Sequence, residues 1–275
     1  MECLVNDRRA WAYSGGKPFE ADGPCLVFIH GALHDHSVWT LPARWFAHHG
    51  WRVLAVDLPG HGRSQGPVPA DVAGLARWLL ALLDAAGVAQ AALCGHSMGS
   101  LIALEAAALA PERVTHLALV GSAVPMPVAQ ALLDGARDDP DAAIDLVNRY
   151  SHSTLAAKPG CPGPGAWLHG ANKALMRRVL AQSGAAEAGC AVNLFHHDFS
   201  VCNSYARGLE AAAEVRCPST LILGRQDRMT PPRAAQALAR TLRAEVLELD
   251  AGHALMQEAP EHFLAALRQA LQRLG

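Results

Sequence analysis

Several features that mark large classes of protein are missing from this sequence. No apolar run reaches the roughly 18 residues that a membrane-spanning helix needs. The 23 basic and 25 acidic residues nearly balance, giving a formal net charge of −2, and the basic residues are scattered along the chain. This charge pattern argues against a nucleic-acid or anionic-lipid partner. We therefore expect a small-molecule partner, with no nucleic acid and no membrane; the oligomeric state is not indicated by the sequence.

The cysteine spacings typical of disulfide frameworks and zinc sites are also missing. The seven cysteines are an odd number, widely spaced and without a C-x-x-C pair, which disfavours both a disulfide framework and a zinc site. The first residues carry Glu2, Asp7, Arg8 and Arg9 and no apolar segment of the length found in signal peptides. These features predict a cytoplasmic protein with reduced thiols.

Apolar residues, by contrast, are plentiful. A chain of 275 residues that is 51% hydrophobic can bury a large core, either as one α/β domain or as a domain with an insert. Short apolar segments alternate with segments of helical pattern, and this order predicts a mainly parallel sheet flanked by helices. The expected strands are Leu26–Ile29, Val53–Val56, Ala91–Cys94, His116–Val120, Thr220–Leu223 and Glu245–Leu249. The expected helices are roughly Leu41–His49, Asp71–Ala86, Met98–Ala110, Pro232–Arg243 and Pro260–Leu274.

The alternation of strands and helices stops between Ser122 and about Tyr205. Helical pieces such as Val128–Arg137 and Ala171–Gln182 replace it. We therefore predict an α/β core made of residues 1–121 and 206–275, with an inserted helical cap at residues 122–205. Within the cap, proline and glycine alternate over Lys158–Gly165, which predicts a turn or hinge.

The pentapeptide Gly95-His96-Ser97-Met98-Gly99 lies between an expected strand and an expected helix. A serine between two glycines at such a turn can adopt a strained backbone that pushes its hydroxyl clear of the sheet as a nucleophile. The pentapeptide by itself is a weak signal, so the rest of the chain has to supply a base and an acid. Ser97 is the candidate nucleophile.

A serine hydroxyl attacks well when a histidine takes its proton and a carboxylate orients that histidine. His253 follows the last expected strand, and Asp227 follows the strand before it. The carboxyl ends of parallel strands meet at one edge of a sheet, where catalytic groups gather. Asp250 competes with Asp227, but it lies so close in sequence to His253 that we expect it to brace its own loop.

Taken together, the motifs resemble the α/β-hydrolase fold family. They are His30-Gly31-Ala32 with Trp39 downstream, the loop Asp57–Ser64, the serine pentapeptide, and Gly252-His253. The candidate nucleophile, acid and histidine also follow one another along the chain in the family's order. The resemblance covers nearly the whole chain. It implies an oxyanion hole formed by the backbone N–H groups of Ala32 and Met98.

The remaining polar residues near these motifs have plainer interpretations. We expect His30, Asp57 and His61 to make structural hydrogen bonds, and the His96 side chain to point away from the nucleophile. Gly60 and Gly62 are expected at positive φ.

Two clusters, His34-Asp35-His36 and His196-His197-Asp198, offer metal-ligand chemistry but lack metal-site spacing, so we expect polar loop surface and no metal. In the cap, the candidates for an apolar substrate wall are Met126, Leu132, Leu146, Tyr150, Trp167, Leu168, Met176 and Phe195, of which we expect about a quarter to face the cleft.

These observations predict an esterase-like serine hydrolase that forms an acyl-enzyme on a small-molecule acyl substrate and needs no cofactor. The serine at the turn disfavours the haloalkane dehalogenases and epoxide hydrolases of this fold, which place aspartate there. A carbon-carbon bond hydrolase, an acyltransferase or a cofactor-free perhydrolase would use the same three residues, and a small-molecule receptor with residual hydrolase activity can also retain them. The sequence leaves these alternatives open.

Overall fold

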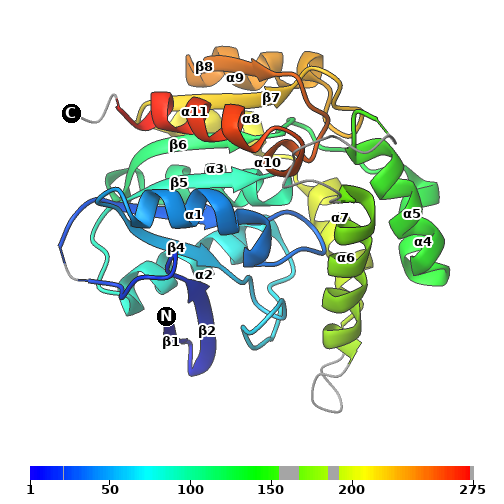
Figure 1. Cartoon of the computed structure of the whole chain (residues 1–275), viewed down its shortest axis with the longest axis horizontal. Helices are drawn as coiled ribbons and strands as arrows, with labels where there is room; N and C mark the ends of the chain where they lie inside the picture. Colours follow the sequence, from blue (N-terminus) through cyan, green and yellow to red (C-terminus); the bar gives the residue numbers. More distant parts are fainter. Residues whose placement is uncertain (21, 155–166, 185–191, 273–275) are drawn as a thin grey trace.

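The computed structural model describes residues 1–20, 22–154, 167–184 and 192–272. In this part of the chain eight strands form one sheet in the order β1-β2-β4-β3-β5-β6-β7-β8 (Figure 1). The six strands from β4 to β8 in that order are parallel to one another. They are β3 (Cys25–Ile29), β4 (Arg52–Val56), β5 (Ala91–His96), β6 (Val114–Val120), β7 (Ser219–Gly224) and β8 (Glu245–Leu249). The predicted parallel sheet and all six of its expected strands are confirmed.

The sequence pattern missed an antiparallel hairpin at one edge of the sheet. Strand β1 (Glu2–Val5) pairs with β2 (Arg8–Tyr13), and β2 pairs with β4. The two-residue turn between them, Asn6-Asp7, has positive φ at both positions, as tight hairpins require. Because β2 begins with two exposed arginines, it offers no apolar run of the kind that revealed the other strands.

Helices cover both faces of the sheet. The five expected helices are confirmed, with ends shifted by a few residues, as α1 (Thr40–Ala47), α2 (Val72–Ala85), α3 (Met98–Leu109), α9 (Gln236–Leu242) and α11 (Pro260–Leu271). The sequence pattern did not predict α8 (Gly208–Glu214), α10 (Leu255–Glu258) or the short 3-10 turns η1 (His36–Trp39) and η2 (Pro111–Arg113). The expected helix Pro232–Arg243 begins as the 3-10 turn η3 (Pro232–Ala235) and continues as α9. Helices α1 and α11 lie over one face of the sheet, and α2, α3 and α8 lie over the other (Figure 1).

Each face of the sheet has its own hydrophobic core, because side chains alternate along a strand. In β3, Val27 and Ile29 join the core beneath α2 and α3, whereas Leu26 and Phe28 join the core beneath α1 and α11. Helix α3 is buried on almost its whole circumference, which explains why its sequence is apolar apart from Ser100 and Glu105.

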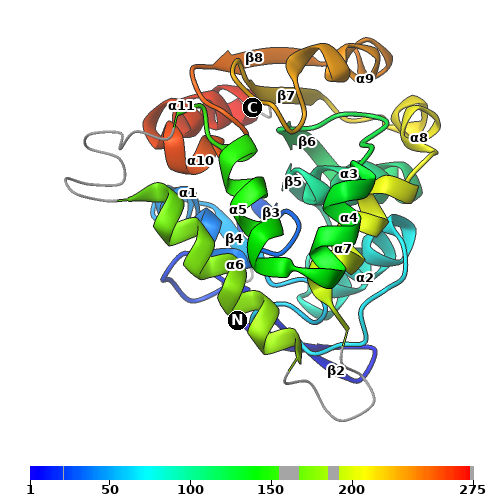
Figure 2. The ribbon, with the colours of Figure 1, turned by 90° about the vertical axis from the view of Figure 1, so that its right-hand side faces the viewer.

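Between β6 and α8 the described residues form four helices, called the cap helices below, which lie together beyond the carboxyl ends of the parallel strands (Figures 1 and 2). They are α4 (Gln130–Asp138), α5 (Pro140–Ser151), α6 (Leu168–Gly184) and α7 (Leu194–Ser204). The sequence pattern predicted two of the four, α4 and α6. The predicted hinge at Lys158–Gly165 lies outside the described residues. No helix in the described ranges is long and apolar enough to cross a membrane.

Candidate active site

Ser97 sits at a sharp turn between β5 and α3. Its backbone has φ 53° and ψ −120°, and its N–H donates to the Val120 carbonyl at 2.9 Å. The flanking glycines are required by close backbone contacts. A Cβ on Gly95 would lie 2.1 Å from the Gly99 carbonyl oxygen, and one on Gly99 would lie 2.3 Å from that of Ile29. The packed backbone thus holds the serine in a conformation that costs on the order of 1–3 kcal/mol.

His253 and Asp227 come together at the ends of neighbouring strands. The Nδ1 of His253 lies 2.7 Å from Oδ2 of Asp227. The other oxygen of Asp227 accepts from the backbone N–H groups of Met229 and Thr230, both at 2.8 Å. Burial by itself raises the pKa of Asp227, but His253 and the Thr230 hydrogen bonds outweigh it and hold the pKa below its usual value. The ionised carboxylate therefore keeps Nδ1–H of His253 bonded, so the lone pair of the neutral ring lies on Nε2.

The competing acid, Asp250, does not contact His253 in this way. Its Oδ1 accepts from the side-chain amide of Gln226, so it braces the loop that carries it, as expected.

A second acid, which the sequence did not single out, holds the His253 loop. Glu258, at the end of α10, is buried and accepts from the backbone N–H of Gly252 at 3.0 Å. The same carboxylate accepts from the N–H and hydroxyl of Ser153, just past α5. Ser151 accepts from the N–H of Ala254 at 3.0 Å. The histidine loop is therefore fixed to the end of α5, and no motif in the sequence pointed to this contact.

His96, beside the nucleophile, is not among the residues that line the cavity beneath the cap. Its Nε2–H donates to the carbonyl of His253 at 2.9 Å, and the two rings lie 4.7 Å apart. Burial, followed by the nearby His253, holds the pKa of His96 well below its ordinary value. The neutral ring supports the histidine loop, a role that its expected orientation away from the nucleophile did not reveal.

The loop that carries Ala32 begins with His30. This buried ring donates from Nδ1 to the Gly31 carbonyl at 2.8 Å and accepts at Nε2 from the N–H of Leu58 at 3.1 Å. Burial, with a smaller effect of His61, lowers the pKa of His30 to about 4. His30 is thus a neutral structural residue, as expected, and it joins the loop that carries Ala32 to the loop after β4.

Asp198 joins the loop that carries Ala32 to helix α7. Its Oδ2 accepts from the N–H of Leu33 at 2.8 Å and from Nε2 of His61 at 2.9 Å. Asp198 lies fully buried on α7, so the expectation of loop surface for this residue was wrong. Burial favours neutral forms of both partners, but their attraction outweighs it: the pKa of His61 is raised and that of Asp198 is depressed. The helical pattern of α7 is weak, which is why the sequence did not place this residue.

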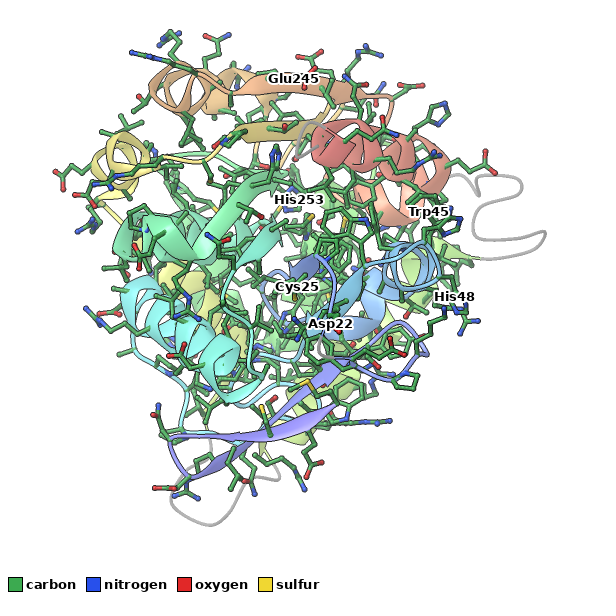
Figure 3. All side chains as sticks on the ribbon, turned by 90° about the vertical axis from the view of Figure 1, so that its left-hand side faces the viewer. Asp22, Cys25, Trp45, His48, Glu245 and His253 are labelled. Carbon is green, nitrogen blue, oxygen red and sulfur yellow. The ribbon has the colours of Figure 1, made fainter. Side chains whose placement is uncertain are left out.

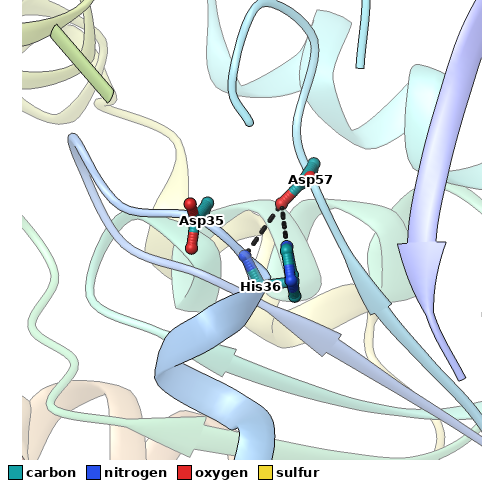
Figure 4. Close-up of side chains that lie close together, drawn as sticks. All are labelled: Asp35, His36 and Asp57. Carbon is teal, nitrogen blue, oxygen red and sulfur yellow. Dashed lines mark hydrogen bonds and ion pairs between the residues drawn. The ribbon is translucent and has the colours of Figure 1, made fainter. Parts of the chain in front are cut away.

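Of the other suspected cluster, His34-Asp35-His36, the structure brings Asp35 and His36 next to Asp57, and hydrogen bonds hold these residues (Figure 4). The His34 ring instead has Nδ1 2.6 Å from the Ala32 carbonyl and Nε2 2.9 Å from Oδ1 of Asn172. Asp35, His36 and Asp57 place one possible ligand atom each within 4.8 Å of one another. Asp57, however, accepts from both the N–H and Nδ1 of His36 at 2.8 Å and from the N–H of Arg63 at 2.9 Å. Asp35 accepts from the N–H of Ser37 and from Arg178 on α6 at 2.6 Å. These carboxylates brace loops, the role expected for Asp57. Asp35 is buried, so the expectation of loop surface was wrong for this residue.

The loop after β4 also has the expected glycine geometry. Gly60 and Gly62 have φ of 80° and 52°. A Cβ on Gly62 would meet the Asp57 carboxylate at 2.3 Å, so glycine is needed there for space as well as for its backbone conformation.

Ser97, His253 and Ala32 line one cavity of about 340 Å³ beneath the cap helices. His253 itself lies well inside the molecule and is only 6% exposed (Figure 3). The apolar wall comes mainly from the cap and includes Met126, Val128, Leu132, Leu146, Tyr150 and Phe199. Of the eight cap residues suggested by the sequence, four line the cavity, twice the expected share. The others pack or lie elsewhere: Met176 and Phe195 are buried among the cap helices, for example, and Trp167 is 62% exposed.

The molecule thus combines a mainly parallel sheet, helices on both of its faces and a cavity lined by Ser97 and His253. A family model described as the alpha/beta hydrolase family matches residues 26–267. The chain is 33% identical to a pimeloyl-[acyl-carrier protein] methyl ester esterase of Methylococcus capsulatus, over 79% of this chain and 82% of that protein. The chain therefore belongs to the alpha/beta hydrolase family and is a hydrolase.

Two further relatives show the range of this family. The chain is 26% identical to 3-oxoadipate enol-lactonase 2 of Acinetobacter baylyi, over 93% of this chain and 91% of that protein. The structure of an enol-lactonase from Burkholderia xenovorans superposes with a TM-score of 0.80 and 22% identity, covering 99% of this chain and all of that one. Several other curated relatives match over only 30–43% of their own length.

Proposed function

We propose that this hydrolase cleaves a small carboxylic ester through an acyl-enzyme on Ser97, with His253 as base and Asp227 as the acid that orients it. One observation carries the proposal: a serine at positive φ shares a cavity with a histidine whose Nδ1 is held 2.7 Å from a buried carboxylate. This arrangement is the one that nucleophilic acyl transfer requires.

In the proposed reaction the Oγ of Ser97 attacks the ester carbonyl while Nε2 of His253 takes its proton. Asp227 stabilises the imidazolium that forms. The backbone N–H groups of Ala32 and Met98 stabilise the oxyanion, and Met98 adds the positive end of helix α3. Collapse of the intermediate expels the alcohol, which receives the proton from His253. Water then attacks the acyl-enzyme by the same steps and releases the acid.

Ester cleavage is supported over the alternatives by the relatives that align over most of their length. One is named for a methyl ester and another for a lactone, which is a cyclic ester. Acyltransferases, perhydrolases and carbon-carbon bond hydrolases share the nucleophile and differ in the bond that breaks or in the acceptor that takes the acyl group. The choice between them is therefore a matter of which acceptor or leaving group the cavity admits.

The test is turnover of p-nitrophenyl acetate and butyrate by the wild type and by Ser97→Ala, together with intact-protein mass after a fluorophosphonate probe. We expect kcat of Ser97→Ala to fall by something approaching a millionfold, as for triads that act as a unit. Ser200→Ala is the control, because Ser200 bonds the His196 carbonyl within its own helix. Full activity or labelling in Ser97→Ala would overturn the proposal, and labelling without turnover in the wild type would favour a receptor.

A further inference from the structure

Arg228 stands out among the residues that line the cavity. Of these residues, as far as the structure describes them, it is the only one with a permanent charge. It follows Asp227 directly, in the loop between β7 and η3, so its backbone lies beside the proposed catalytic acid. The chain as a whole carries a formal charge of only −2 and has no broad field. Arg228 can therefore attract an anion only over the short distances within the cavity, without help from a field of the whole molecule.

The guanidinium of Arg228 is held in place by helix α5. It lies over the ring of Tyr150, 5.0 Å from the ring centroid, and Nη2 donates to the carbonyl of Arg149. No carboxylate of the described residues forms an ion pair with it, whereas several other arginines, such as Arg178 and Arg225, are paired. A fixed guanidinium with donors to spare is preorganised to bind a planar anion through two parallel hydrogen bonds.

The neighbouring Asp227 does not cancel this charge. Its two oxygens accept from the N–H groups of Met229 and Thr230, the Thr230 hydroxyl and Nδ1 of His253. Both of its oxygens are thus already hydrogen-bonded within the loop and to His253, and within the described residues its ion pair is with His253 and not with Arg228. The rest of the cavity wall formed by α5 is apolar and would not accept a carboxylate without a partner, because an unpaired buried charge is costly.

We propose that Arg228 is a specificity-determining residue, and that the substrate is a small ester or lactone that carries a carboxylate. This inference rests on the proposed ester hydrolysis at Ser97. The apolar walls from α4, α5 and α7 take the hydrocarbon part, and Arg228, an exposed residue at the rim, binds the carboxylate. A cavity of about 340 Å³ lies at the small end of ligand sites, so the substrate is small.

The experiment compares matched esters that differ by one charge. Mono-p-nitrophenyl glutarate and p-nitrophenyl pentanoate place a carboxylate or a methyl group at the end of the same acyl chain. The pair 4-acetoxybenzoate and 4-tolyl acetate places the carboxylate on the alcohol side instead. The readout is the ratio of kcat/KM for the charged ester to that for the neutral one, and the two pairs show which side of the ester carries the anion.

We expect the wild type to favour the charged member of at least one pair. Arg228→Gln should lower that ratio by roughly ten- to a hundredfold, the range of a hydrogen bond to a charged group, and Arg228→Lys should lower it less. Arg225→Gln is the matched control. Arg225 is exposed on the same loop and pairs with Glu248 instead of lining the cavity, so its loss should leave the ratio unchanged.

A binding measurement separates this inference from the proposed function. Isothermal titration of glutarate into Ser97→Ala requires no turnover, and binding should be lost in the Ser97→Ala, Arg228→Gln double variant. Binding that survives the loss of Arg228, or wild-type turnover that does not distinguish the esters, would overturn the inference and leave Arg228 as a support for α5. Absence of ester turnover with Arg228-dependent binding would instead overturn the proposed function alone.

Discussion

At the scale of single residues, His30 makes stability depend on pH. Burial lowers its pKa to about 4 from the ordinary 6.5. Between these values the unfolded chain binds a proton that the folded chain does not, so acid favours unfolding. The stability contributed by the neutral ring is fully present above pH 6.5 or so and is lost as the pH falls toward about 4, by on the order of 3 kcal/mol.

Urea unfolding at pH 7 and pH 4 measures this effect. The free energy of unfolding should fall less between the two pH values in His30→Gln than in the wild type. His48 lies exposed on the surface (Figure 3), and His48→Gln should keep the wild-type pH dependence. If the His30→Gln variant lost as much stability in acid as the wild type, the buried ring would not be the cause.

At the scale of elements, Asp198 of α7 ties the cap to the loop that carries Ala32. Asp198→Asn removes the charge that pairs with His61 and weakens the acceptor for Leu33. Breaking a buried pair on one side costs about 3–5 kcal/mol, and a displaced Leu33 would shift its neighbour Ala32. We therefore expect the variant to lose stability in urea unfolding, and to lose kcat on p-nitrophenyl butyrate with a smaller change in KM.

The matched control for this prediction is Asp141→Asn. Asp141 pairs with Arg177 on the surface of the cap, and both side chains are more than half exposed. Such pairs contribute about 0–1 kcal/mol. A loss of stability in Asp198→Asn without any loss of kcat would limit Asp198 to a structural role.

The elements themselves were largely readable from the sequence, whereas their contacts were not. The parallel strands and main helices are recognisable because buried strands are short apolar runs and the helices have an apolar face. Ser97, Asp227 and His253 were singled out as candidates because they follow strand ends. Asp198, Glu258 and Arg228 gave no comparable signal. Their partners lie far away in sequence, as with Leu33 and Asp198, which are 165 positions apart.

At the scale of the whole molecule, cap helices belong to the same hydrophobic core as the face of the sheet beneath α1 and α11. Leu132, Ile144 and Phe195 of the cap belong to the same buried cluster as Phe28 and Trp39 of the core. We therefore expect the predicted cap, residues 122–205, to unfold together with the rest of the chain. Scanning calorimetry should show one transition whose calorimetric and van't Hoff enthalpies agree. Two separable transitions would contradict this shared core.

The backbone at Ser97 has a further consequence. Glycine adopts positive φ without the steric cost that any side chain incurs there. Ser97→Gly should therefore be more stable than Ser97→Ala by about 1 kcal/mol in urea unfolding, although both lack the hydroxyl. Equal stabilities would mean that the turn holds no strain. If the strain is present, a variant library screened for heat resistance alone would enrich glycine at position 97 and lose the proposed nucleophile. An engineering campaign on this protein therefore has to select for turnover from its first round.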